Sequence, residues 1–409
     1  MSMENKLDQW IQSATKKMTL PLRIELWNGK HFQLSPAAPT VTIRIPQASA
    51  LRYLFTPSLS NLGGAYVDGH IDILGKSSEI ITVGGELAAK SLKQEGQFGR
   101  LRRSLKRSKA KDAEAISFHY DVSNEFYRLW LDDSMSYSCA YFEKGDEDIA
   151  SAQLKKIDHV LAKLSIGPND TLLDIGCGWG ALVIRAAQQY GIRCVGVTLS
   201  KNQADLARQR VAQQGLSDRV EIRLEDYRDI QGRYSRISSI GMFEHVGLQN
   251  LPDYFRKIYN LLSDEGIALN HGITSTDPDS GESPYGGGEF IERYVFPHGQ
   301  VPHIGLVLKA MQEGGLEALD VENLRKHYAR TCAIWSDNFE RNSEEIRKEA
   351  GDKRYRIWRL YLAGCAYGFE ADWISLFQVV CTKAGGTQAM LPWSRAHLYP
   401  GNIPSRSLR

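Results

Sequence analysis

Three short segments near the amino end of the chain alternate apolar and polar side chains with a period of two, which predicts β-strands. The segments are residues 22–29, 31–36 and 40–46. Asn28 followed by Gly29 predicts a hairpin turn between the first two strands. A glycine-rich, apolar stretch follows them. We therefore expect residues 1–88 to form a small α+β domain.

From residue 115 onward, apolar runs of strand length alternate with amphipathic segments of helix length. Strands are predicted within residues 170–180, 192–200, 219–229 and 234–247, and helices within residues 181–191 and 201–215. Repeated units of this kind predict a doubly wound, mostly parallel sheet. We expect residues 115–409 to form an α/β domain whose ligand site lies beyond the carboxyl ends of the strands.

The segment that joins these two regions, residues 89–114, is strongly basic. Between residues 90 and 111, nine Lys and Arg side chains face a single acidic one. Such a run is typical of a solvated linker. Phe98, Leu101 and Leu105 recur among the basic residues at helical spacing, however, which favours contact with an anionic membrane surface. Both interpretations stay open on the sequence.

Composition and charge restrict the class of protein further. The contents of 42% hydrophobic and 24% charged residues are typical of a globular chain, and the net charge of +2 gives no general attraction to nucleic acid. No apolar run approaches the roughly 18 residues of a spanning helix. The six cysteines are scattered singly, so neither a metal site nor a disulfide framework is predicted. We expect a cytoplasmic protein that associates peripherally with the inner face of the membrane.

The glycine turn after the first predicted strand of the α/β region is the leading candidate for a ligand site. Gly176, Gly178 and Gly180 allow the backbone to approach a ligand and to present it to the start of the next helix. Asp174 lies at the strand end, where its carboxylate can accept from a cationic or hydroxyl group. A purely structural turn is the alternative interpretation of the glycines alone.

Several motifs resemble those of one enzyme family. LDIGCGWG, residues 173–180, is close to the first motif of the S-adenosylmethionine-dependent methyltransferases, and GVTLS-x-x-Q is the variant found in the cyclopropane fatty acid synthases. The segments FHYDVSNEFYRLWLDDSMSYSCAYF, GMFEHVG and EFIERYVFPHGQVP are also similar to signatures of that family. The resemblance covers nearly the whole chain and weakens after about residue 330. It implies a Rossmann-like class I methyltransferase fold.

The resemblance implies S-adenosylmethionine as the cofactor, with Gln203 in place of the acidic residue that usually binds the ribose hydroxyls. A helix cap is an alternative role for Ser200. The residues expected to contact the cofactor are Tyr137, Ser138, Asp174, Gly176, Cys177, Gly178, Trp179, Gly180, Thr198, Leu199, Ser200, Gln203, Asp226, Tyr227 and Arg228.

The resemblance further implies transfer of a methylene group to cis double bonds of unsaturated phospholipid acyl chains, with a bound bicarbonate as the base that completes the ring. Its expected partners are Glu244, His271, Ile273, Tyr328 and Cys139. On the residues alone, a core histidine is the favoured role of His271.

Cys365 occupies the position of a C-terminal cysteine once suspected as a nucleophile in that family. A buried, inert thiol is the alternative role, because no neighbouring basic residue would generate a thiolate. The acidic residues at 370 and 372 depart from the family pattern and put the local substrate contacts in doubt.

Two other functions remain open on the sequence. One is methyl transfer that leaves a branch in place of a ring, and the other is a non-catalytic protein that binds lipid surfaces. We also expect a homodimer, with no metal and no nucleic-acid partner.

Overall fold

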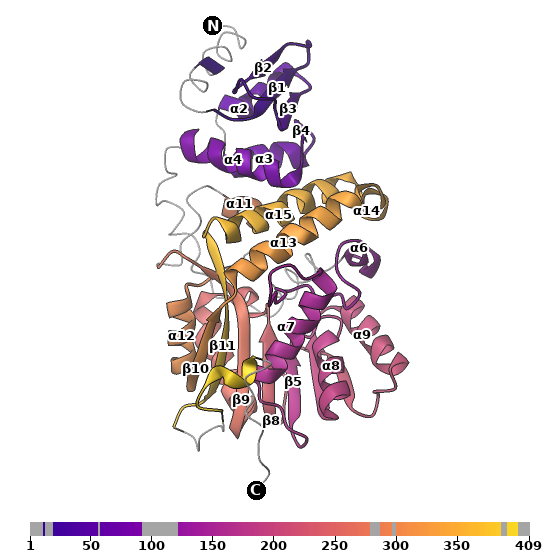
Figure 1. Cartoon of the computed structure of the whole chain (residues 1–409), viewed down its shortest axis with the longest axis vertical. Helices are drawn as coiled ribbons and strands as arrows, with labels where there is room; N and C mark the ends of the chain where they lie inside the picture. Colours follow the sequence, from indigo (N-terminus) through magenta and orange to yellow (C-terminus); the bar gives the residue numbers. More distant parts are fainter. Residues whose placement is uncertain are drawn as a thin grey trace. The chain divides into compact units, whose positions relative to one another are not determined.

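The structure is a computed structural model that describes residues 11–12, 19–55, 58–91, 122–278, 287–296, 300–385 and 391–399. The chain divides into two compact units (Figure 1). The first comprises residues 1–105, 281–297 and 332–373, and the second comprises residues 106–280, 298–331 and 374–409. The boundaries expected from the sequence, 1–88, 89–114 and 115–409, stay a prediction. Nearly all of the basic segment lies outside the described residues.

The first unit contains the small sheet predicted near the amino end. Its strands are β1 (Leu22–Leu26), β2 (His31–Gln33), β3 (Val41–Ile45) and β4 (Asp72–Leu74), in the order β2-β1-β3-β4. Strand β1 pairs antiparallel with β2 through the predicted hairpin and parallel with β3. Alternate side chains of β1 and β3 are buried, as their sequence period of two predicts.

Helices from distant parts of the chain complete this unit. They are η1 (Ala48–Leu51), α2 (Arg52–Phe55), α3 (Leu59–Val67), α4 (Ser77–Ser91), α11 (Gly287–Tyr294), α14 (Ser343–Ala350) and α15 (Asp352–Glu370). Buried Arg359 on α15 donates hydrogen bonds to the Tyr66 hydroxyl and the Ile73 carbonyl, both at 3.1 Å, and pairs with Glu340 at 3.0 Å. This guanidinium joins α15 to the amino-terminal elements because it satisfies acceptors on each.

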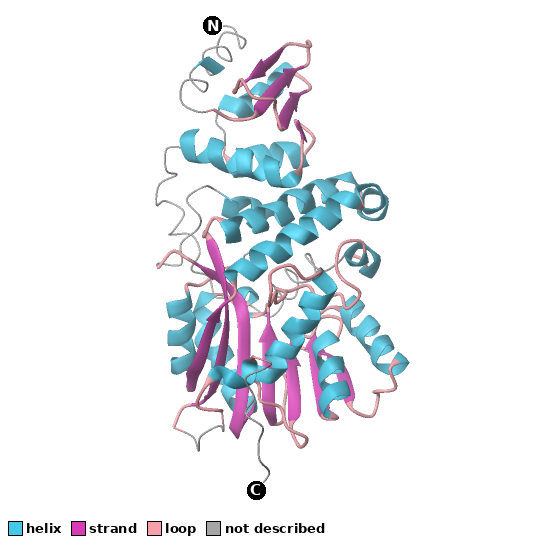
Figure 2. Cartoon of the chain, in the orientation of Figure 1, coloured by secondary structure: helices cyan, strands magenta, loops and turns pink. Residues whose placement is uncertain are grey.

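The second unit is built on a seven-stranded sheet in the order β10-β11-β9-β8-β5-β6-β7 (Figure 2). The strands are β5 (Thr171–Ile175), β6 (Arg193–Thr198), β7 (Val220–Leu224), β8 (Tyr234–Ile240), β9 (Leu262–Ser275), β10 (Leu316–Asn323) and β11 (Ile374–Lys383). Strands β5 to β9 are parallel, whereas β11 is antiparallel to both of its neighbours. The predicted doubly wound, mostly parallel sheet is confirmed, and β5 to β8 are the four strands that the sequence pattern predicts.

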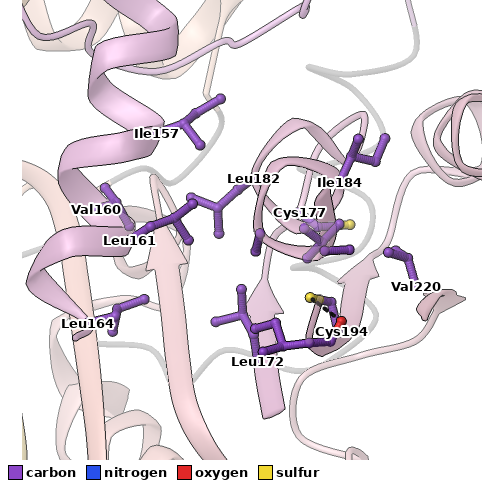
Figure 3. Close-up of a cluster of buried hydrophobic side chains, with 14 of the residues drawn as sticks. Ile157, Val160, Leu161, Leu164, Leu172, Cys177, Leu182, Ile184, Cys194 and Val220 are labelled. Atoms are coloured by element: carbon purple, nitrogen blue, oxygen red, sulfur yellow. Dashed lines mark hydrogen bonds between the residues drawn. The ribbon is translucent and has the colours of Figure 1, made fainter. Parts of the chain in front are cut away.

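Helices cover both faces of this sheet. The unit contains α6 (Asn124–Arg128), α7 (Ile149–Lys163), α8 (Ala181–Tyr190), α9 (Lys201–Gln213), η3 (Phe243–His245), η4 (Leu248–Asn250), α10 (Leu251–Leu261), α12 (Ile304–Glu313), η5 (Arg395–Leu398) and the start of α13 (Arg325–Arg341). Apolar side chains of α7 and α8 form one core cluster with the strands (Figure 3), to which α9 also contributes, and those of α10 and α12 form a second. Both faces are thereby sealed, which leaves the carboxyl edge for ligands. Among the described helices, none is long and apolar enough to cross a membrane.

Candidate active site

The glycine turn between β5 and α8 has the backbone geometry that a ligand loop requires. Gly176, Gly178 and Gly180 all have positive φ values, of 83°, 54° and 84°, which L-residues with side chains adopt rarely. The Gly176 and Cys177 amides donate to the Val197 carbonyl at 3.0 and 2.9 Å, so the turn is anchored on β6. A Cβ atom added to Gly178 would meet no atom within 4 Å. This glycine therefore faces open space.

A cleft with a volume of about 1040 Å³, including the part open to solvent, lies over this turn at the carboxyl edge of the sheet. Most of the residues expected to bind a cofactor line it. They are Tyr137, Ser138, Asp174, Gly176, Cys177, Gly178, Trp179, Thr198, Leu199, Gln203 and Tyr227. The sequence analysis missed other lining residues, among them Lys156, Glu225 and His245. Glu225 directly follows β7, so its strand-end position could have identified it.

The other four residues in the expected cofactor set lie outside the lining. Ser200 caps α9 by accepting a hydrogen bond from the Gln203 amide at 3.3 Å, which is the alternative role expected for it. Gly180 occupies the cap position of α8. Asp226 and Arg228 form an ion pair at 2.7 Å.

One end of the cleft presents groups suited to sugar hydroxyls and an aromatic base. The buried Gln203 side chain accepts through Oε1 from the Thr198 hydroxyl at 2.8 Å, which orients its amide group. The Glu225 carboxylate and the Tyr227 ring line the cleft beyond it. Carboxylate and amide groups can bind hydroxyls, and an aromatic face can stack on a base.

The end nearer β5 is lined by charged and aromatic groups. The Asp174 carboxylate accepts from the Ser238 hydroxyl at 2.7 Å, and burial raises the pKa of Asp174 to about 6 against the opposing effects of Ser238 and Lys156. The Tyr127 ring of α6 packs on Trp179 with centroids 5.0 Å apart. The Trp179 indole donates to the Asn124 side chain at 2.8 Å. Helix α6, part of the aromatic-rich motif, thus supports this wall of the cleft.

A second group of predicted residues lies beyond the cleft, near the ends of β8 and β9. The Glu244 Oε1 atom accepts from the Ile273 amide at 2.7 Å, while its buried Oε2 has no hydrogen-bond partner within the described residues. Burial raises the pKa of Glu244 to about 7. The Gln378 amide nitrogen lies 3.1 Å from His271 Nδ1, so Nδ1 accepts and Nε2 carries the proton. Burial holds the pKa of His271 well below its usual value.

His271 Nε2 is also buried and unpartnered within the described part of the chain. The site therefore offers a neutral imidazole N–H donor and a carboxyl group that holds its proton up to about pH 7. Each of these two groups has a buried polar atom that could form a hydrogen bond to a small polar ligand.

Cys139 and Tyr328 belong to the same unit as these residues. Cys139 is fully buried, burial raises its thiol pKa, and its Sγ lies 3.9 Å from the Leu324 carbonyl oxygen. The Tyr328 amide donates to the same carbonyl at 3.0 Å. The segment that carries Cys139 is thereby held at the start of α13. None of the residues expected to bind bicarbonate lines the cofactor cleft itself.

Cys365 falls in the first unit, on α15. Desolvation raises its thiol pKa to about 12. A thiolate is the form that reacts as a nucleophile, so this environment favours the inert thiol.

The sheet order, the antiparallel β11 and the cleft over a glycine turn define a Rossmann-like class I methyltransferase. Residues 107–379 match the sequence model described as mycolic acid cyclopropane synthetase. The chain belongs to this cyclopropane synthase family of S-adenosylmethionine-dependent methyltransferases. Residues 9–96 match a second model, described as a domain of unknown function.

Individual relatives support this assignment. A probable fatty acid methyltransferase of Pseudomonas putida is 46% identical over 390 residues, which cover 94% of this chain and 98% of the relative. Cyclopropane mycolic acid synthase 1 of Mycobacterium tuberculosis is 36% identical and covers 66% of this chain and 96% of its own length. The crystal structure of mycolic acid cyclopropane synthase CmaA1 complexed with SAH and CTAB has a TM-score of 0.64, 35% identity, and coverage of 66% of this chain and 98% of the other.

Proposed function

We propose that this protein is a cyclopropane-fatty-acyl-phospholipid synthase. It transfers a methylene group from S-adenosylmethionine to a cis double bond of an unsaturated phospholipid acyl chain. The observation that carries the proposal is the combination of the cofactor cleft with the buried Glu244 and His271 groups at the adjoining strand ends. Ring closure needs a base that takes a proton from the transferred methyl group, and the buried Glu244 and His271 could hold such a base.

The cofactor, when bound, supplies an electrophilic methyl group on a positively charged sulfur. Because an alkene is a weak nucleophile, the cleft acts by holding the reacting carbon close to the double bond. A new C–C bond forms as the S–CH₃ bond breaks, and positive charge develops on the other alkene carbon. Loss of a proton from the transferred methyl group then provides the electron pair for the second C–C bond.

The residues near β8 and β9 serve the removal of that proton. The protonated Nε2 of His271 and the carboxyl group of Glu244 would hold bicarbonate, with Tyr328 and the Ile273 amide as the further predicted contacts. Bicarbonate supplies a base there. In the ligand-free structure the Ile273 amide donates to Glu244, so it would contact bicarbonate only by sharing or exchanging that hydrogen bond.

The lipid substrate is supported by the names of two relatives, a probable fatty acid methyltransferase and a cyclopropane mycolic acid synthase. Membrane phospholipid in particular is supported by the basic segment between residues 90 and 111, which could contact an anionic surface. This segment implies peripheral attachment from the cytoplasmic side.

The experiment compares Glu244→Gln with wild type in turnover and in affinity for S-adenosylhomocysteine. We expect turnover to fall by roughly 100-fold or more with unchanged affinity, because the change affects proton removal and not the cofactor cleft. Glu221→Gln on the exposed side of β7 is the matched control. In carbonate-free buffer, wild type should lose activity that added bicarbonate restores. Full activity without carbonate would contradict the bicarbonate role.

A second candidate function is C-methylation that leaves a methyl branch. The name of the Pseudomonas putida relative, a probable fatty acid methyltransferase, favours it. In that reaction the positive charge is removed by loss of a proton from a neighbouring carbon, or by a hydride from a separate donor, and the transferred methyl group keeps all its hydrogens. With a CD₃-labelled donor the two outcomes differ in product mass, because the branch retains three deuterium atoms and the ring retains two.

A further inference from the structure

Lys156 on α7 is a buried cation inside the cofactor cleft. Its side chain is only 4% exposed and lines the cleft beside Ser138 and Asp174. Its neighbour Lys155 has the opposite environment, because its side chain is 34% exposed and bridges Glu143 and Glu147 at 2.7 and 2.8 Å. The two lysines, adjacent in sequence, therefore have different roles.

The hydrogen bonds of Lys156 are incomplete. An ammonium group has three donors, and the Nζ atom of Lys156 has one partner among the described residues, the Ser138 hydroxyl at 2.8 Å. It forms no ion pair there. Buried Lys163, the last residue of α7, is by contrast paired with Glu322. A buried charge is costly unless it is paired, so the position of Lys156 indicates an anionic partner that arrives with a ligand.

Burial lowers the pKa of Lys156, whereas the nearby carboxylates of Asp132 and Asp174 oppose that effect. These groups favour the charged ammonium without forming a direct ion pair. Asp174 is itself turned toward Ser238. The end of the cleft near β5 thus presents one cation and one carboxylate, separated from each other.

This pair of charges matches one part of the cofactor. The methionine arm of S-adenosylmethionine carries a carboxylate and an ammonium group, while the adenosine part is uncharged. Gln203, Glu225 and Tyr227 at the β6 and β7 ends suit the ribose and the base. The methionine arm is then left at the β5 end, with Lys156 and Asp174.

We propose that Lys156 is a positioning residue that binds the carboxylate of the methionine arm and so fixes the sulfonium over the substrate site. This inference rests on the proposed function, in which the cleft holds S-adenosylmethionine. Ser138 orients the ammonium, and Asp174 complements the amino group of the arm.

The test measures two ligands by titration calorimetry on wild type, Lys156→Met and Lys155→Met. S-adenosylhomocysteine carries the carboxylate, whereas 5′-methylthioadenosine lacks the whole amino-acid arm. We expect Lys156→Met to lower the affinity for S-adenosylhomocysteine by roughly 10- to 100-fold, which corresponds to the loss of a charge-assisted hydrogen bond. The affinity for methylthioadenosine should change by less than about twofold. Lys155→Met should change neither affinity. Lys156→Arg, which keeps the charge, should recover part of the loss.

Methylthioadenosine reports whether the cleft is folded in each variant. The carboxylate contact would be overturned if Lys156→Met lost affinity for both ligands equally, or lost affinity for neither. The kinetic readout is independent, because the variant should raise KM for S-adenosylmethionine more than it lowers kcat. Failure of wild type to bind either ligand would instead overturn the proposed function.

Discussion

The carboxyl group of Glu244 should make stability depend on pH in a way that an isosteric variant removes. Burial raises the pKa of Glu244 from the ordinary value of 4.5 to about 7. Between these values the folded state keeps a proton that the unfolded state has released, so rising pH favours unfolding. The stability contributed by the neutral form is fully present below pH 4.5 and is lost as the pH rises through about 7.

At about 1.4 kcal/mol for each pH unit, the loss amounts to about 3 kcal/mol. In Glu244→Gln the side chain stays neutral at every pH, and its oxygen can still accept from the Ile273 amide. The variant should therefore gain about 2 to 3 kcal/mol relative to wild type between about pH 5 and about pH 8. Asp174, whose pKa is also raised, contributes equally to both proteins and cancels in the difference.

The assay is urea unfolding of the ligand-free proteins at these two pH values, followed by tryptophan fluorescence. The measured quantity is the difference in free energy of unfolding between the variant and wild type. A difference that does not change with pH would show that Glu244 is ionised at the lower pH, and the reasoning from its burial would be wrong.

Three further changes test other parts of the structure. Gly178→Val should abolish binding of S-adenosylhomocysteine, because a side chain there projects into the open space over the turn and the φ of 54° disfavours a β-branched residue; unchanged affinity in a folded variant would refute the site. Cys365→Ser should keep turnover within about twofold, since its thiol is held protonated, and a loss of turnover without a loss of folding would restore a catalytic role. Replacing the four basic residues within 102–107 by Gln should weaken binding to anionic vesicles by up to about 4 kcal/mol in low salt. If the variant sediments with such vesicles as well as wild type does, at both low and high salt, the segment is only a linker.

Strands β5 to β8 could be predicted because β5 and β6 are mostly apolar and each is followed by a helix-length segment, while β7 alternates apolar and charged residues. Strands β9 to β11 were harder to predict. Strand β9 (Leu262–Ser275) begins with polar residues, and β10 (Leu316–Asn323) has one exposed face. The first unit includes residues 332–373, and that association depends on contacts such as those of Arg359, which have no local signal.

The residues of the candidate site also divide into those that the sequence could predict and those that it could not. Residues that end parallel strands, such as Asp174 and Thr198, meet at one edge because the sheet is parallel, so they could be placed in a common cleft. Lys156 could not be found in this way. On α7, Leu154 is 45% exposed while Lys156 is 4% exposed, which inverts the usual order of burial. Only the packing of α7 against the cleft distinguishes Lys156 from Lys155.

The central claim is that a methylene group is transferred and a ring is closed. The most direct test incubates the protein with S-adenosylmethionine labelled as CD₃ and liposomes of unsaturated phospholipid, then measures the acyl-chain mass. Ring closure removes one deuterium, so the account predicts a product that gains one carbon and retains two deuterium atoms. A product with all three deuterium atoms would contradict it in favour of a methyl branch, and an unlabelled acyl chain would contradict catalysis on phospholipid.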